Sequence, residues 1–241
     1  AEPKPDDPRP AGDADAVSVL AFTRTTGYRH ASIDPAVRAL RAVASERGWR
    51  FEHTEDPARF SDGGLAAADV IVFLLTTGDV LDDAQQAALE RWLHAGGGWV
   101  GVHSASDTEY DWPWYGRLVG AYFAAHPRIQ SATVRVARPG HSATAHLPAV
   151  WQREDEWYDF RTNPRQEVDV LLTVDEATYD GGGMGADHPI AWSRAFEGGR
   201  SIYTALGHTE AAWSEPAFLD HIAGAIAWAA ASSRLPRHVS D

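Results

Sequence analysis

The sequence predicts an α/β fold with a mainly parallel central sheet covered by helices on both faces. Strand-like and helix-like segments alternate through the first half of the chain, which is typical of parallel sheets. The second half is richer in strand-like segments and adds further strands. The 241 residues show no internal repeat, so we expect one α/β domain at residues 17–232. A flexible Pro/Asp-rich tail at 1–16 and a C-terminal tail at 233–241 are expected to flank it.

In the first half, the hydrophobic pattern distinguishes buried strands from amphipathic helices. Continuous apolar runs such as VSVLAFT (residues 17–23) and DVIVFLL (69–75) are typical of strands buried on both faces. After the first strand, Ile33, Val37 and Leu40 recur at helical spacing. We therefore expect strands at 17–23, 49–54, 69–75 and 99–103, and helices at 33–47 and 82–95.

The pattern of the second half predicts a series of strands followed by one helix. We expect strands at 129–136, 168–174, 190–196 and 200–206, and an amphipathic helix at 216–230. The glycine-rich segment 181–185 is expected to be a loop. It lacks the strand-to-helix context of a phosphate-binding loop, so we assign it no ligand.

The composition argues against several classes of function. A formal net charge of −13 disfavours nucleic acid and anionic membrane surfaces as partners, because both require a basic face. No apolar run reaches the roughly 18 residues of a membrane span, so we expect no membrane insertion. The chain has no cysteine, which removes disulfides, thiolate nucleophiles and cysteine-bound zinc. A small-molecule partner fits best, and the sequence does not indicate an oligomeric state.

The N-terminal segment suggests a location for the protein. The chain starts on alanine and continues as AEPKPDDPRP, as a processed secretion signal followed by a proline-rich spacer would. We expect a secreted, extracellular protein, with a cytoplasmic location as the alternative.

Polar residues follow the predicted strands, and in parallel sheets ligands bind at the carboxyl ends of the strands. His103 ends the strand at 99–103, at the position where catalytic and ligand-binding residues lie in such folds. The candidates for substrate binding at the other strand ends are Thr26, Tyr28, Arg29, His30, Thr77 and Asp79. Four separate strand ends are thus expected to converge on one rim of the sheet.

Histidines and acids at this rim are candidates for catalysis or metal binding. A neutral imidazole acts as a base or a metal ligand near pH 7, so His103 is the first candidate for either role, against a core histidine satisfied by backbone groups. His208, Glu210 and Asp107 are candidate acid/base groups, and most other acids are expected to be solvated. His103, His126 and His208 together offer a zinc or copper site if they converge. The acids at 154–156 are expected to cap or flank a strand.

The segment after His103 is unusually aromatic. Tyr110, Trp112 and Trp114 follow within a dozen residues, and Trp213 lies just after His208. Such rings either pack into the core or form a flat surface on which a sugar ring stacks. We assign them to a sugar-binding surface as one hypothesis and to core packing as the other.

Five segments together resemble the ThuA-like (trehalose utilisation) family: FTRTTGYRHASI, LLTTGDVL, GGGWVGVHSASD, GAYFAAHP and ALGHT, in family order over residues 17–230. The resemblance implies the flavodoxin-like, three-layer fold of class I glutamine amidotransferases and a role in carbohydrate metabolism. In those enzymes a catalytic cysteine occupies the place of His103, and an H-x-E pair resembles His208 and Glu210. Since the chain has no cysteine, glutamine hydrolysis through a thioester is excluded.

These observations lead to one main hypothesis and two alternatives. The main hypothesis is an enzyme that acts on a sugar or keto-sugar derivative at a histidine-rich pocket, by hydrolysis, elimination or isomerisation. The alternatives are a non-catalytic sugar-binding accessory domain and a protein that binds a divalent metal through histidines.

Overall fold

The computed structural model describes residues 16–231, so the predicted tails at 1–16 and 233–241 fall outside it except for Ala16. The strands are β1 (Ser18–Phe22), β2 (Arg50–Thr54), β3 (Val70–Leu74), β4 (Gly98–Val102), β5 (Phe123–Ala125), β6 (Gln130–Val136), β7 (Val150–Asp155), β8 (Asp159–Phe160), β9 (Asp169–Asp175), β10 (Pro189–Phe196) and β11 (Gly199–Thr204). The helices are α1 (Ile33–Glu46), α2 (Asp62–Leu65), α3 (Asp83–His94), α4 (Pro113–Val119) and α5 (Pro216–Ala230).

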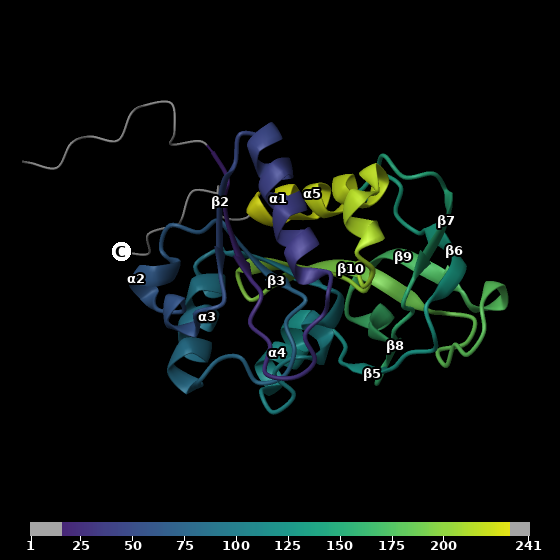
Figure 1. The fold of residues 1–241 in the computed structure, drawn as a ribbon. Helices are drawn as coiled ribbons and strands as arrows, with labels where there is room; N and C mark the ends of the chain where they lie inside the picture. The colour runs from purple at the N-terminus through teal and green to yellow at the C-terminus, as the bar shows by residue number, and fades with distance from the viewer. Residues whose placement is uncertain (1–15, 232–241) are drawn as a thin grey trace, which may run out of the picture.

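Nine of these strands form one sheet in the order β2-β1-β3-β4-β11-β10-β9-β6-β7 (Figure 1). Strands β2, β1, β3, β4 and β11 are paired in parallel. From β11 through β10, β9 and β6 to β7, every pairing is antiparallel. The predicted α/β fold is confirmed, and the sheet is mixed because the extra strands of the second half join it directly.

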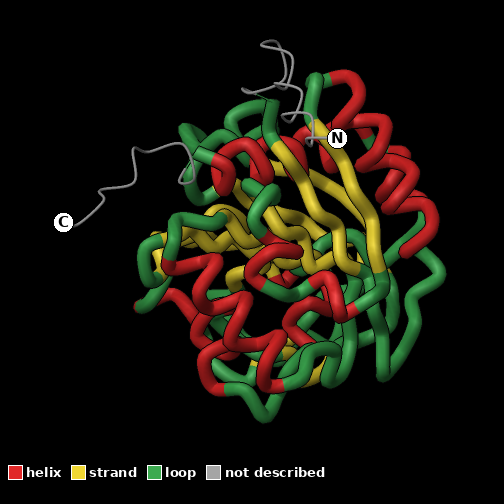
Figure 2. Tube along the Cα trace, turned by 90° about the vertical axis from the view of Figure 1, so that its left-hand side faces the viewer, coloured by secondary structure: helices red, strands yellow, loops and turns green. Residues whose placement is uncertain are grey.

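Helices cover both faces of the parallel half, which is why its strands β1, β3 and β4 are fully buried and almost entirely apolar (Figure 2). Neighbouring residues of β4 show the two faces. A Cβ atom on Gly98 would lie 2.4 Å from the Ala229 carbonyl oxygen, so β4 approaches α5 closely on one face. On the other face the ring of Trp99 packs at 5.8 Å from that of Tyr115 in α4.

Five elements were not expected from the sequence: strands β5, β7 and β8, and helices α2 and α4. Strand β7 alternates exposed and buried residues, but two of its buried positions hold Arg153 and Asp155, so the alternation is not one of hydrophobicity. Helix α4 begins with Pro113 and ends at Val119, and the φ of 93° at the following Gly120 favours glycine. The short pair β5–β8 lies outside the main sheet. Within residues 16–231, no helix combines the length and apolar character needed to cross a membrane.

Candidate functional site

One rim of the sheet gathers residues from both halves of the chain. Strands β4 and β11 are parallel, so His103 and His208, which follow them, lie at the same rim. Because the direction alternates from β11 to β7, this rim also receives the carboxyl end of β7, which Glu156 follows. His30 reaches the rim from the loop after β1. The rim therefore brings together four side chains that are far apart in sequence.

These four side chains, His30, His103, Glu156 and His208, form one cluster, in which each offers an oxygen or nitrogen atom within 4.8 Å of the others. Glu156 Oε2 lies 3.0 Å from His208 Nδ1 and 3.4 Å from His103 Nε2. The two imidazole nitrogens are 3.1 Å apart. Such close approach of ionisable groups is typical of catalytic and metal sites.

His103 lies at the centre of the cluster and is completely buried. Its φ of 53° puts the backbone in the left-handed region, so the chain turns sharply at the end of β4. Nδ1 of the ring donates to the Ala205 carbonyl oxygen at 2.7 Å, which directs Nε2 toward Glu156 and His208. The Tyr158 ring packs against the imidazole with the ring centres 4.2 Å apart. The contacts thus fix both the orientation and the tautomer of the ring.

The charge of the cluster is concentrated on Glu156. Burial alone would raise the pKa of its carboxyl group, but hydrogen bonds from His103 and His208, together with their charge, outweigh burial and hold that pKa below its usual range. Burial first, and then the neighbouring His103 and His208, lower the pKa of the His30 imidazole to about 3. At neutral pH, Glu156 is therefore a carboxylate and His30 is uncharged.

Asp155, the last residue of β7, fixes the backbone beside two members of the cluster. Its Oδ1 accepts hydrogen bonds from the backbone N–H groups of Glu156 and His208, each at 3.0 Å. Its Oδ2 accepts from the Gly207 N–H and from Arg153 Nη2, each at 2.9 Å. Asp155 has no solvent exposure, so these bonds are made away from water.

A cavity of about 340 Å³ opens on the cluster, which is in the range of small-molecule sites, about 300–1,000 Å³. It is lined by Tyr28, His30, Asp107, Phe123, His126, Glu156, Tyr158 and His208. Phe123 packs against Tyr158 at 4.3 Å between ring centres, and Tyr28 is 66% exposed. Aromatic faces and ionisable groups thus share one cavity.

Five of the predicted site residues lie in this cavity, namely Tyr28, His30, Asp107, His126 and His208. His103 lies behind it in the cluster. Asp107 accepts a hydrogen bond from the Tyr110 hydroxyl at 2.6 Å, so Tyr110 supports a cavity residue.

The structure places other predicted polar residues outside the cavity lining. Thr26 donates to the carbonyl oxygens of Thr77 and Asp79, and these contacts close the loops after β1 and β3. Arg29 pairs with Glu55 at 2.8 Å on the surface. Glu210 is exposed at the start of a short 3₁₀ turn. These residues shape the rim around the cavity rather than its wall.

The predicted tryptophans are core residues. Trp112 and Trp114 stack on each other at 5.0 Å between ring centres and are 8% and 6% exposed. Trp213 is 3% exposed and donates to the Gly207 carbonyl oxygen at 3.0 Å. None of the three lines the cavity. The core-packing hypothesis therefore describes them, because Trp114 packs against Phe196 of β10 and Trp213 against Phe218 of α5.

The set of potential metal ligands differs from the one expected. His103 and His208 belong to the cluster, whereas His126 contacts Glu156 Oε1 at 3.1 Å and is 42% exposed. His30 and Glu156 take its place in the cluster. From the sequence, Glu156 was expected only to cap or flank a strand. Because Arg153 and Asp155 hold buried positions, segment 150–155 shows no hydrophobic alternation that would have marked the strand before it.

A second group, Asp159, Glu176 and His188, also combines potential metal ligands. His188 Nε2 donates to the Tyr158 carbonyl oxygen at 2.8 Å, and Nδ1 lies 2.8 Å from Glu176 Oε1. The same carboxylate accepts from the Met184 N–H at 2.8 Å. Because its groups bond to each other and to the backbone, we interpret this group as a network that holds Tyr158 against His103.

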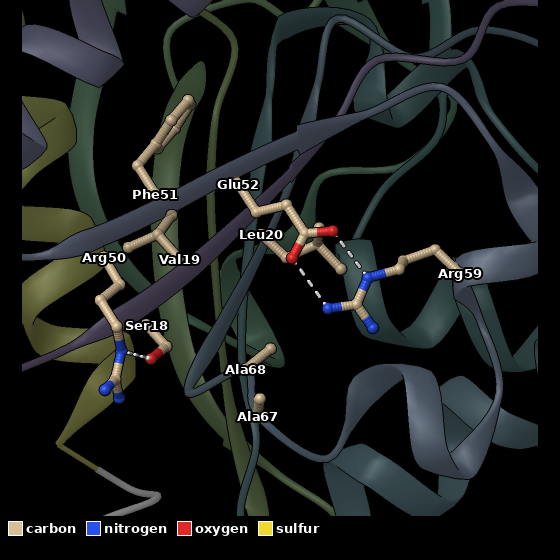
Figure 3. Close-up of a pocket in the computed structure, with 9 residues that line it drawn as sticks. All are labelled: Ser18, Val19, Leu20, Arg50, Phe51, Glu52, Arg59, Ala67 and Ala68. Atoms are coloured by element: carbon tan, nitrogen blue, oxygen red, sulfur yellow. Dashed lines mark hydrogen bonds and ion pairs between the residues drawn. The ribbon is translucent and has the colours of Figure 1, made fainter. Parts of the chain in front are cut away.

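A separate groove of about 180 Å³ lies at the β1–β2 edge of the sheet (Figure 3). Figure 3 shows the Arg59 guanidinium bonded to both carboxylate oxygens of Glu52, at 2.7 and 2.8 Å. It also shows Arg50 Nε bonded to Ser18 Oγ, at 2.8 Å. The charged groups of this groove are engaged in protein contacts, so the cavity beside the cluster is the better candidate for a ligand site.

The fold and the cluster define a class: a mixed α/β protein with an imidazole- and carboxylate-lined cavity at one rim of its sheet. The family model of ThuA, described as trehalose utilisation, matches residues 18–229. The chain belongs to the ThuA family.

Solved structures agree with this assignment. The chain is similar to a protein described as ThuA-like from Bacteroides uniformis, with 26% identity over 92% of this chain and 95% of that one, and a TM-score of 0.76. A ThuA-like protein from Parabacteroides merdae is 19% identical over 89% of this chain and 90% of that one, with a TM-score of 0.73. The fold is also similar to one part of a β-galactosidase from Bacillus circulans, at 12% identity over 89% of this chain and 32% of that one, with a TM-score of 0.56. A comparison with curated proteins gave no match.

Proposed function

We propose that this protein is an enzyme that moves a proton on a sugar derivative carrying a carbonyl group, and so isomerises it or eliminates a leaving group from it. The observation that carries the proposal is that Asp107 shares one cavity with the His–Glu cluster and with aromatic walls. The family description, trehalose utilisation, supports a carbohydrate as the substrate class.

In the proposed mechanism, the sugar ring packs on the aromatic wall with its carbonyl oxygen directed at the cluster. Asp107 removes the proton from the carbon next to the carbonyl group, the electrons of the C–H bond form a C=C bond, and the carbonyl oxygen becomes an enolate. The imidazoles of His30 and His208, which line the cavity, stabilise the charge that develops on this oxygen. For isomerisation, the hydroxyl group on the deprotonated carbon gives its proton to the enolate oxygen and becomes the new carbonyl group as the abstracted proton returns to the former carbonyl carbon. For elimination, the enolate re-forms the carbonyl group and a β-substituent departs with its bonding electrons.

The experiment is exchange of the proton next to the carbonyl group in D₂O, followed by NMR, with 3-keto derivatives of glucosides as substrates. Asp107→Asn should lower the exchange rate by at least 100-fold, since a positioned acid or base contributes about 10²–10⁴-fold. Asp111→Asn is the matched control, because Asp111 is exposed in the same segment and outside the cavity lining. Equal rates in the two variants would contradict the proposal. Saturable sugar binding without exchange or turnover would indicate the accessory-domain alternative.

We also propose that the finer fold assignment is flavodoxin-like, as in class I glutamine amidotransferases. The order β2-β1-β3-β4-β11 of the parallel strands supports it, because flavodoxin-like sheets have the order 2-1-3-4-5.

A further inference from the structure

The geometry of the cluster matches one face of a metal tetrahedron. The three distances among His103 Nε2, His208 Nδ1 and Glu156 Oε2 are 3.1, 3.0 and 3.4 Å. Zinc binds nitrogen and oxygen ligands at about 2.0–2.1 Å, so neighbouring ligands of a tetrahedral ion lie about 3.4 Å apart. An ion in contact with all three atoms therefore fits with small shifts of the side chains.

The surrounding structure directs these atoms at one another. Nδ1 of His103 donates to the Ala205 carbonyl oxygen, so Nε2 faces His208 and Glu156. A cation placed among the three atoms would attract all of them.

The fourth potential ligand completes the set. The ring of His30 is almost perpendicular to those of His103 and His208, at 5.0 and 5.2 Å between ring centres. Its Nδ1 lies 3.4 Å from Ser104 Oγ, and its side chain offers a nitrogen within the 4.8 Å cluster. Three imidazoles and one carboxylate are ligands that zinc and its neighbours among the divalent transition metals accept.

The surroundings of the cluster resemble the outer shell of a metal site. In metal sites the second nitrogen of a ligating histidine usually donates to a carbonyl or carboxylate oxygen, as His103 Nδ1 does. Glu156 Oε1 contacts His126 at 3.1 Å, which leaves Oε2 directed at the cluster. The cavity reaches three of the four groups, so a ligand of the protein would also reach the ion.

We propose that His30, His103, Glu156 and His208 together bind one divalent transition-metal ion of the zinc type. The inference deepens the proposed function and rests on it for the role of the ion, which would accept the carbonyl oxygen of the substrate as a fifth ligand and polarise it. Binding of the ion itself is tested independently of turnover.

The test uses untagged protein that has been dialysed against a chelator and then titrated with Zn²⁺ or Co²⁺. We expect one ion per chain by calorimetry and elemental analysis, and the absorption of tetrahedral Co²⁺ in the visible spectrum. Glu156→Gln and His208→Gln should each weaken binding at least ten-fold. Glu154→Gln is the matched control, because Glu154 is exposed on β7 two residues from Glu156. Circular dichroism confirms that each variant is folded.

The outcomes separate this inference from the proposed function. Absence of stoichiometric binding by the wild-type protein would overturn the metal site, as would equal affinity in Glu156→Gln and Glu154→Gln. Full proton exchange in the chelated protein would overturn the role of the ion and leave the enzyme assignment intact. Tight binding of one ion without exchange on any keto-sugar would support the metal site and contradict the proposed function.

Discussion

Replacement of Asp155 by asparagine should destabilise the whole protein, because this side chain makes four buried contacts with one negative charge. The amide oxygen of the variant can keep the two bonds that Oδ1 accepts from the backbone N–H groups of Glu156 and His208. The amide nitrogen would then face two further donors, Arg153 Nη2 and the Gly207 N–H, at the place of Oδ2. Two bonds are lost, one of them to a buried guanidinium.

The magnitude follows from these losses. Removal of one partner from a buried ion pair costs about 3–5 kcal/mol, since the other charge stays buried. For a domain of this size, each kcal/mol lowers the melting temperature by about 2–4 °C, so we expect a decrease of roughly 6–20 °C. Glu215 Oε2, 3.4 Å from Arg153 Nη1, still balances part of the arginine charge in the variant. We therefore expect a decrease in melting temperature near the lower end of this range.

The assay is urea unfolding, followed by tryptophan fluorescence, of the wild-type protein and two variants. Asp180→Asn is the matched control, because Asp180 forms an ion pair with Arg128 in which the two side chains are 88% and 69% exposed. Exposed pairs of this kind contribute little, so its midpoint should stay close to that of the wild type. A loss below about 1 kcal/mol in Asp155→Asn would refute the reasoning that Asp155 is a buried anchor.

Three further predictions concern the core and the cavity. Burial lowers the pKa of the His221 imidazole from 6.5 to about 4 in the folded protein. As the pH decreases from 6.5 toward 4, the imidazole therefore binds a proton in the unfolded chain but not in the folded one, and the free energy of unfolding falls. At pH 5 this loss of stability is about 2 kcal/mol. Urea unfolding of His221→Asn should not show it, and the same pH dependence in the variant and the wild type would contradict the prediction. Gly98→Ala should lower the free energy of unfolding by about 1–3 kcal/mol in the same assay, because the new Cβ would lie 2.4 Å from a carbonyl oxygen of α5. Gly140→Ala, the control, should leave stability almost unchanged, because there is open space around Gly140. Trp114→Ala should lower the free energy of unfolding by about 3–5 kcal/mol and leave keto-sugar binding unchanged, because Trp114 is buried. Tyr28→Ala should weaken keto-sugar binding in calorimetry with little effect on the melting temperature, because Tyr28 is exposed. The reverse result would support the hypothesis that the tryptophans form the sugar-binding surface.

The centre of the parallel half could be predicted from the sequence because burial on both faces makes β1, β3 and β4 almost continuously apolar. The expected strand at 17–23 and the observed Ser18–Phe22 differ by one residue at each end. Strand β7 gave no such signal, since two of its inward positions hold the buried ion pair of Arg153 and Asp155. Charge at those positions obscures the alternation of hydrophobicity from which a half-buried strand is identified.

The site could be predicted only as far as the direction of each strand was known. The rule that ligands lie at carboxyl ends pointed to His103 and His208, which follow parallel strands. Glu156 follows a strand that was not expected, and His188 precedes a strand, β10, that runs in the opposite direction. Trp112 and Trp114 illustrate another limit, because aromatic content alone does not indicate on which side of the backbone the rings pack.

The alternation of strand direction that places the cluster at one rim leaves the connection between β6 and β7 at the opposite end of the sheet. Gly140 is exposed in this connection, with room around its Cα. A cysteine introduced there would be the sole thiol of the chain and would accept a dye or a surface tether. Molecules immobilised through it would all present the mouth of the cavity to the solution, which suits measurement of ligand binding on single oriented proteins.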